Sequence, residues 1–161
     1  MTYLGTVLKK MSIEVILSSA ETRTKESVEI IAQELSLPVV CLDELQGRKW
    51  GDFAGKHWDE VSKILDAKTL GERYAFTPPR GESAEQFESR MLAVIRKIHQ
   101  KYAGKNVCIV SHGSSIRVLL PKAFGVPFEE SLKAYPEYGS VSTVEYDGQN
   151  FTSPTFNRLY T

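Results

Sequence analysis

His112 is the residue whose surroundings most clearly allow chemistry. An apolar run at 107–110 is followed by Ser111, His112 and Gly113, and a helix-like segment comes next. In α/β proteins ligands bind where parallel strands end, and the free N–H groups at the start of the following helix attract anions. The pattern therefore predicts a phosphate site beside the imidazole. The same residues also fit an ordinary turn between a strand and a helix, so His112 alone does not decide.

A second candidate site follows the apolar run at 13–17. The sequence there is Ser18-Ser-Ala-Glu-Thr-Arg-Thr24, at the entrance to another helix-like segment. An arginine in the first turn of a helix can present its planar fork to a phosphate. Arg23 and Ser19 are therefore candidate phosphate-binding residues, although first-turn arginines are often merely solvated. If the two strands are parallel, Arg23 and His112 lie at the same edge of one sheet.

Two carboxylates are candidates for a general acid. Glu44 comes just after the apolar run at 39–42, and Glu82 lies in a turn before a long helix-like segment. A carboxylic acid near a phosphate can protonate the departing alkoxide. Each glutamate also has an ordinary alternative, Glu44 as a solvated loop residue and Glu82 as a favourable charge at a helix N-terminus. Both interpretations stay open for both residues.

The elements that must position these residues alternate between strands and helices. Ser83 and Gln86 have the spacing of a capping box at the start of the longest helix, and residues on either side of Asp147-Gly148 alternate as in a hairpin. The pattern predicts strands at 13–17, 39–42 and 106–111, helices at 21–35, 58–66, 84–102 and 114–124, and a hairpin at 140–146 and 150–160.

Strands separated by helices predict an α/β fold. We expect a three-layer sandwich, with a mostly parallel sheet, helices on both faces and a C-terminal antiparallel strand or hairpin. The sequence contains no repeat, low-complexity segment or linker. A single domain covering 1–161 is therefore expected.

Charge and composition limit the partners. Twenty basic and twenty acidic residues cancel, and the sequence pI is about 6.8. No global charge attracts nucleic acid or a membrane surface, and no apolar run is long enough to span a membrane. Cys41 and Cys108 lie in apolar runs, where buried and reduced thiols are expected. We expect a cytoplasmic protein with no nucleic-acid or membrane partner.

Four motifs together resemble the histidine phosphatase superfamily, in its phosphoglycerate mutase-like group. They are Ser18-Ser-Ala-Glu-Thr-Arg-Thr-Lys-Glu-Ser, Trp50-Gly-Asp-Phe-Ala-Gly-Lys, Pro79-Arg-Gly-Glu-Ser and Val110-Ser-His-Gly-Ser-Ser-Ile-Arg. The resemblance covers most of the chain, from near residue 4 to near residue 145. It implies phosphoryl transfer through a phosphohistidine, by a phosphatase or a phosphomutase that acts on a small phosphorylated molecule. It implies no metal and no cofactor.

The resemblance also implies roles for individual residues. Arg23 matches the arginine that grips the phosphoryl group, and Ser19 belongs to the same substrate-binding motif. His112 matches the second histidine of the family, which lies against the phosphate and donates to it. Gly113 and Ser114 match positions whose backbone lines the substrate pocket.

The chain departs from the family pattern in two places. Family members begin with a strand ending in Arg-His-Gly, which supplies the nucleophile, and neither His57 nor His99 has such neighbours. We therefore expect a chain truncated at its N-terminus, with weak or no turnover of its own. Many members also carry a glutamate four residues before the glycine that Gly51 matches, and this chain has Gly47 there. Glu44 and Glu82 remain the candidate acids.

Two alternatives to the family activity follow from these departures. The chain is a catalytically dead module that still binds phosphorylated ligands, or it is a homologue that associates with itself. In the family, the missing strand lies beside the strand that ends at His112. Its loss predicts an exposed edge at 106–111, which either another strand of the chain covers or a second copy pairs with.

Overall fold

Three parallel strands form the central sheet of the computed structural model, which describes residues 2–160. They are β1 (Val15–Ser19), β2 (Val39–Leu42) and β3 (Val107–Val110), in the order β2-β1-β3. In the middle strand, Ile16 lies opposite Val39 on one side and Cys108 on the other. All three strands therefore end at the same edge of the sheet.

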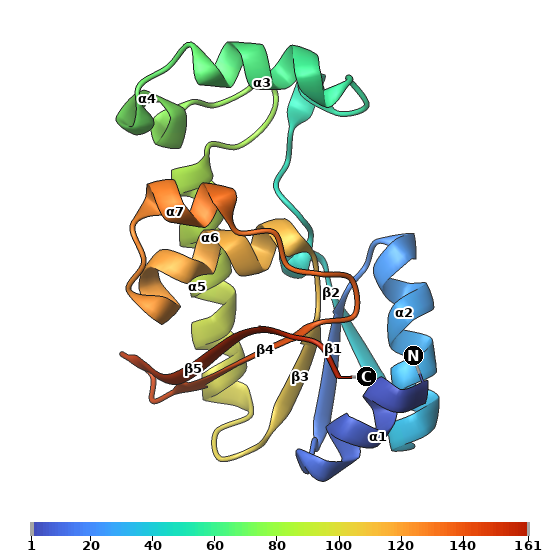
Figure 1. Ribbon diagram of the computed structural model, residues 1–161. Helices are drawn as coiled ribbons and strands as arrows, with labels where there is room; N and C mark the ends of the chain where they lie inside the picture. The colour runs from blue at the N-terminus through green and yellow to red at the C-terminus, as the bar shows by residue number, and fades with distance from the viewer. Residues whose placement is uncertain (1, 161) are drawn as a thin grey trace.

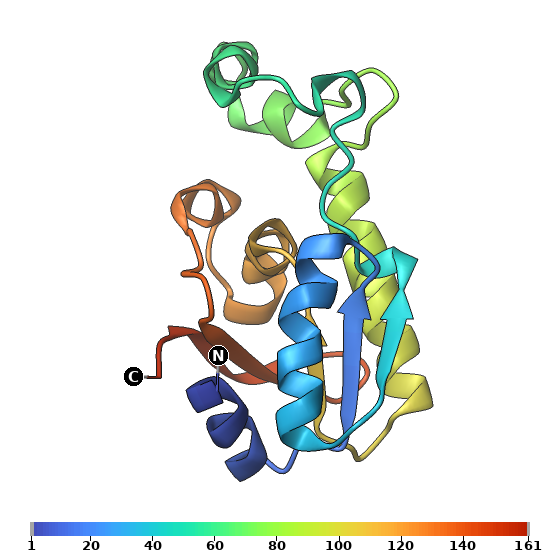
Figure 2. The same cartoon turned by 90° about the vertical axis from the view of Figure 1, so that its right-hand side faces the viewer.

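Successive residues of β1 face opposite layers of helices, because side chains alternate across a strand. Ile16 packs with residues of α1 (Thr2–Lys10) and α2 (Thr22–Leu35). Leu17 packs with residues of α5 (Ala84–Lys101) and α6 (Gly113–Phe124). Figures 1 and 2 show these helices on the two sides of the sheet. The predicted three-layer α/β architecture is confirmed.

Helix α5 forms as its sequence pattern predicts. The hydroxyl of Ser83 accepts a hydrogen bond from the backbone N–H of Gln86, and the Gln86 side chain accepts one from the backbone N–H of Ser83. This capping box satisfies N–H groups that a helix start leaves unpaired. The apolar stripe of the helix is buried in the core, with Phe87, Met91, Val94 and Ile98.

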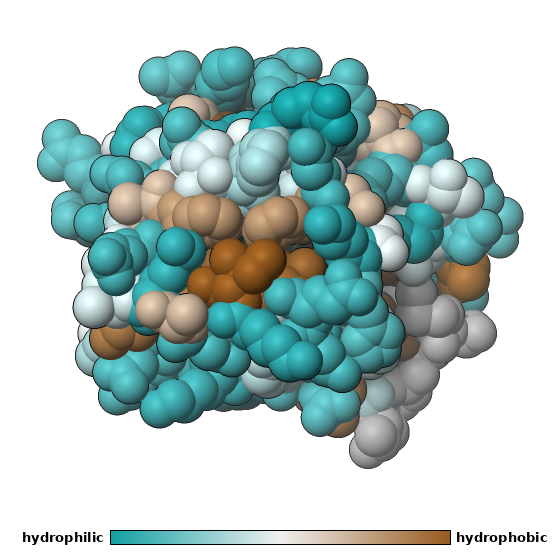
Figure 3. Space-filling view, turned by 90° about the horizontal axis from the view of Figure 1, so that it is seen from above, coloured by the Kyte–Doolittle hydropathy of each residue, from teal (hydrophilic) through white to brown (hydrophobic). Residues whose placement is uncertain are grey.

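The upper part of the molecule lies beyond the carboxyl ends of the strands (Figure 1). It contains α3 (Trp58–Asp66) and α4 (Leu70–Ala75), with the short turns η1 (Asp43–Leu45) and η2 (Gly51–Phe53) leading to them and α7 (Phe128–Lys133) facing them from below. The sequence predicted α3, whereas the six-residue helices α4 and α7 are additional. From above, an apolar area interrupts a largely hydrophilic face (Figure 3). Within residues 2–160, no helix has the length and apolar character that crossing a membrane requires.

The predicted C-terminal hairpin consists of β4 (Val141–Tyr146) and β5 (Phe151–Arg158), which pair with each other in a separate antiparallel sheet. β5 packs on α6, where the rings of Phe124 and Phe156 lie 5.9 Å apart. Because the hairpin is held there, it does not extend the central sheet. The expectation that another strand of the chain covers 106–111 is therefore wrong for residues 2–160, in which β3 pairs with β1 alone.

The expectation that both cysteines are buried is wrong for Cys41, which lies at the opposite edge of the sheet. Cys41 is exposed, whereas Cys108 is half-buried. The difference follows from strand position, because Cys41 lies on the edge strand β2 and its neighbour Val40 is exposed as well.

Two glycine-containing motifs that are distant in sequence form one unit by close backbone contact. The backbone N–H of Asp52 donates to the carbonyl of Pro79, and that of Glu82 donates to the carbonyl of Lys49, both at 2.9 Å. Gly51 has a φ of +53°, and a Cβ there would lie 2.0 Å from the Pro79 carbonyl oxygen. The close approach therefore requires glycine at position 51.

Substitution of this glycine tests the packing. Gly51→Ala is expected to lower the free energy of unfolding by about 3 kcal/mol or more, because a left-handed backbone cost adds to a clash with the backbone of the second motif. Gly125→Ala is the matched control, since Gly125 has a φ of +66° but open space around its Cβ position. It should lose only about 1–2 kcal/mol. Urea denaturation measures both values, and equal losses would contradict the close contact.

Candidate functional site

His112 lies at the carboxyl edge of the sheet, where β3 ends and α6 begins. The residue is 8% exposed. Its Nδ1 accepts a hydrogen bond from Nε of Arg23 at 3.1 Å, so in the neutral ring the proton lies on Nε2. Nε2 in turn lies 3.0 Å from the hydroxyl oxygen of Ser19 and 3.2 Å from Oε1 of Glu21. The imidazole is thus fixed in the tautomer that donates from Nε2.

Arg23 and His112 meet although 89 positions separate them in the sequence. Arg23 lies in the first turn of α2, directly after β1, and His112 directly after β3, so the pairing of β1 with β3 brings them together. Arg23 uses Nε for His112 and keeps its side chain 68% exposed. The guanidinium is therefore accessible from solvent although its Nη2 contacts the carboxylate of Glu21.

Glu21 occupies the space between these donors, and this role was not predicted from the sequence. Its Oε2 lies 2.6 Å from Nη2 of Arg23, and its Oε1 accepts a hydrogen bond from the backbone N–H of Gly47 at 3.2 Å. With Nε2 of His112, three donors of three different chain segments converge on one carboxylate. Such convergence is typical of an anion site, and here the anion is a side chain of the protein itself. The sequence feature that could have indicated a role for Glu21 is its position between Ser19 and Arg23 in one motif.

Gly47 faces the imidazole. A Cβ at this position would lie 3.3 Å from Cγ of His112 and 3.5 Å from the hydroxyl oxygen of Ser114. A longer side chain at position 47 would thus point into the site, and glycine leaves that room free. Ser114 and the exposed Gly113 are the first residues of α6 and border the site on that side.

Glu44 lies away from this group. Its carboxylate is 3.5 Å from Nζ of Lys97 on α5, and its side chain is 49% exposed. A hydrogen bond from its own backbone N–H lowers the pKa of Glu44 below the ordinary range, so the group is ionised near neutral pH. An ionised carboxylate beside a lysine is poorly suited to deliver a proton to a phosphate ester.

Glu82 is engaged in holding the loop that carries Gly47. Its Oε1 accepts from the backbone N–H of Lys49 at 2.9 Å, and its Oε2 accepts from Nε of Arg90 at 3.1 Å. Arg90 in turn donates to the backbone carbonyls of Glu44, Gln46 and Gly47. The buried pair therefore fixes the backbone at Gly47 while both Glu82 oxygens are occupied. Arg90 lies next to the apolar stripe of α5, and its role was not predicted from the sequence.

Burial sets the charge of the site. It lowers the pKa of His112 below 6.5, an effect that the carboxylate of Glu21 opposes and that Arg23 and Arg90 reinforce. The ring is therefore mainly neutral at pH 7 and donates through Nε2. Among the residues that the structure describes, no three His, Cys, Asp or Glu side chains are grouped as metal ligands.

Comparison with known proteins shows which family this chain belongs to. The model of the histidine phosphatase superfamily (branch 1) matches residues 1–158. The chain is 33% identical over 121 residues to the uncharacterized phosphatase PhoE of Bacillus subtilis. It is 30% identical over 125 residues to the 2,3-bisphosphoglycerate-dependent phosphoglycerate mutase of Cytophaga hutchinsonii. This chain belongs to the histidine phosphatase superfamily.

The matched regions differ in how much of each protein they cover. They span 75% of this chain and 58% of PhoE, and 73% of this chain and 59% of the mutase. The structure of Bacillus stearothermophilus YhfR superimposes on 94% of this chain and 77% of its own, with a TM-score of 0.81 and 26% identity. The fold around the site is therefore that of a histidine phosphatase, while the chain spans less than two thirds of the two curated relatives.

The lowered pKa of His112 predicts a pH dependence of stability. Between the lowered pKa and 6.5, the unfolded chain binds more protons at this residue than the folded chain does. The free energy of unfolding should therefore fall as the pH is lowered through that window. His112→Gln should lose this part of the decrease between pH 7.5 and 5.5, measured by urea denaturation at each pH. An equal decrease in both proteins would show that His112 does not contribute.

The position of Glu21 predicts that it competes with anions. Glu21→Gln should bind orthophosphate about threefold to tenfold more tightly, because a charge of the ligand's sign leaves the site while the side-chain shape is kept. Isothermal titration calorimetry measures the affinity. Glu29→Gln, at an exposed position of the same helix, is the matched control and should behave as wild type. Weaker binding in Glu21→Gln would mean that the carboxylate positions Arg23 instead.

Proposed function

We propose that this chain binds the phosphoryl group of small phosphate monoesters between Arg23 and His112, for the phosphatase or phosphomutase chemistry of its family. The observation that carries the proposal is the convergence of Arg23, Nε2 of His112 and the backbone N–H of Gly47 on one carboxylate. A phosphoryl group that replaces the carboxylate of Glu21 meets the same three donors.

Phosphoryl transfer depends mainly on positioned positive charge and hydrogen-bond donors around the phosphoryl oxygens. Arg23 supplies a permanent charge, and its exposed guanidinium can take two phosphoryl oxygens at once. His112 supplies a donor whose orientation is set by Arg23. Gly47 supplies a backbone donor that Arg90 holds in place. Ser19, beside Nε2 of His112, borders the same space.

The covalent step of the family reaction needs a nucleophilic histidine, and His112 does not resemble one. Its Nδ1 accepts from Arg23, and its Nε2 faces the anion as a donor. The other two histidines of the chain lie elsewhere, His57 before α3 and His99 on α5 beside Tyr146. We therefore expect weak or no turnover by this chain alone and no phosphorylation of His112.

A second candidate function is binding of phosphorylated ligands without turnover. It is favoured by Gly47, which leaves no acid at the position where many family members have one, and by the engagement of Glu44 and Glu82 with other residues. Hydrolysis of p-nitrophenyl phosphate above background that is lost in Arg23→Ala would favour the first candidate, whereas anion binding through Arg23 without any such turnover would favour the second.

The effect of Arg23 on anion binding tests what both candidates share. Orthovanadate, which resembles a transferring phosphoryl group, should raise the melting temperature of the wild type because it binds the folded state. Arg23→Ala should lose most of this rise, and Arg23→Lys should recover little because the planar fork is lost. Lys25→Ala, exposed on the same helix, is the control and should keep the full rise. A full rise in Arg23→Ala would overturn the proposed site.

A further inference from the structure

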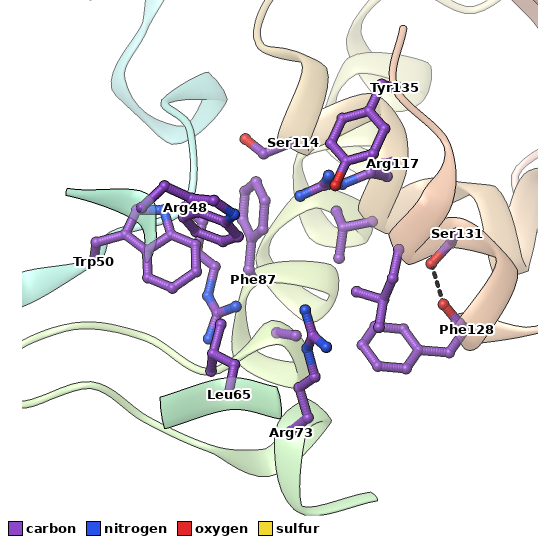
Figure 4. A pocket seen from close by; sticks show the side chains of 14 residues that line it. Arg48, Trp50, Leu65, Arg73, Phe87, Ser114, Arg117, Phe128, Ser131 and Tyr135 are labelled. Atoms are coloured by element: carbon purple, nitrogen blue, oxygen red, sulfur yellow. Dashed lines mark hydrogen bonds between the residues drawn. The ribbon is translucent and has the colours of Figure 1, made fainter. Parts of the chain in front are cut away.

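A cavity separate from the phosphoryl site lies between the end of β2 and the C-terminal half of α5, and we call it the α5 cavity. It has a volume of about 190 Å³, and its wall comes from Leu42 of β2, Glu44 of η1 and residues of α5 with its cap Tyr102. The pocket in Figure 4, whose lining includes Ser114, borders the phosphoryl site instead. The two share no lining residue.

The inner wall of the α5 cavity is apolar. Val94 and Ile98 belong to the buried core, and Leu42 and Tyr102 pack against that core. An apolar cavity of about 150 Å³ can hold a benzene molecule. The α5 cavity is therefore large enough for an aromatic ring or a short alkyl group, which would be removed from water there.

The rim of the cavity carries more positive than negative charge. Nζ of Lys97 lies 3.5 Å from Oε1 of Glu44, and the Lys97 side chain is 70% exposed. Nζ of Lys101 lies 5.2 Å from the centre of the Tyr102 ring. Within residues 2–160, no carboxylate comes within 4.0 Å of Lys101. Two cations at the rim thus face one carboxylate.

The wall and the rim together select one class of ligand. A sugar or another hydroxyl-rich molecule would lose its hydrogen bonds to water against the apolar wall without finding new partners. An amine would face two lysines of its own sign. A small inorganic anion would leave the apolar space empty, whereas a carboxylate on an apolar body matches both features, because an ammonium group donates well to a carboxylate.

We propose that the α5 cavity binds a small monocarboxylate with an apolar body, such as an aromatic acid. The body packs against Val94 and Ile98, and the carboxylate lies between Lys97 and Lys101. Glu44 competes with the ligand for Lys97. The proposal is independent of the proposed function, because no residue of the phosphoryl site lines this cavity.

Binding of benzoate to the whole chain, followed by nitrogen–proton correlation NMR, tests the proposal. Benzoate should shift the amide signals of Leu42, Ile98 and Tyr102. It should bind at least about tenfold more tightly than acetate, which has no ring to bury. It should bind about threefold to fivefold more tightly than neutral benzamide, a modest difference because the rim is open to water.

Charge variants assign this preference to the rim. Lys97→Gln should remove most of the preference for benzoate over benzamide, and an unchanged affinity for benzamide shows that the variant is folded. Arg96→Gln removes the same charge at an exposed position of α5 outside the cavity and should keep the preference. Glu44→Gln should tighten benzoate binding about twofold to threefold, because the competing carboxylate is gone.

Three results would overturn the proposal. Benzoate fails to bind more tightly than both acetate and benzamide, or Lys97→Gln keeps the full preference. In the third, the amide shifts lie at the phosphoryl site and Arg23→Ala abolishes them, so that benzoate binds there as an ordinary anion. If the proposal holds, Arg23→Ala binds benzoate as the wild type does, whether or not that variant responds to orthovanadate. Failure of the α5 cavity and failure of the phosphoryl site are therefore distinguishable.

Discussion

Hydrogen bonding between β1 and β3 is the constraint on which the site depends. The two strands run parallel and in register, with Ser18 opposite Val110, so whatever follows them in the chain meets at one edge. Arg23 follows β1 and His112 follows β3, and the two side chains would not meet if the strands were antiparallel or slipped. A slip by one residue would also exchange the faces of Ile16 and Leu17, which the two helical layers bury completely. Core packing and site geometry are thus set by the same register.

A second constraint is the ion pair of Glu82 with Arg90. It is largely buried, with side chains 12% and 19% exposed, and removal of one partner would leave a charge with little water around it. Through Arg90 the pair holds the carbonyls of Glu44, Gln46 and Gly47, and through Lys49 it holds the next turn of the same loop. The Gly47 N–H that reaches the anion site is therefore positioned from α5. This arrangement gives Glu82 a structural role at the loop that carries Gly47.

The fold was predicted from local sequence patterns. The three strands, the helices α2, α3, α5 and α6 and the hairpin all have periodicity or caps that are visible within a few residues, and α5 even shows its capping box. The short helices α4 and α7 have too few residues for a periodic signal. Parallel strands also sufficed to predict that Arg23 and His112 share an edge. The long-range contacts of Glu21 with Gly47, of Glu44 with Lys97 and of Arg90 with the backbone of Glu44 could not be predicted. Each spans 26 or more positions, and the choice of partner depends on packing. The burial of Cys41 was predicted wrongly for a related reason, because strand order decides which strand lies at an edge of the sheet.

The carboxylate of Glu21 affects which ligands the candidate site can take. At the phosphoryl site, Glu21 already neutralises part of the charge of Arg23, so a phosphoryl group must displace a carboxylate that is bound by three donors. Binding energy gained by a remote group can offset an unfavourable change at the reacting group. In this arrangement, contacts of the rest of a phosphate ester with the protein would offset the displacement of Glu21, and inorganic phosphate would have no such compensation.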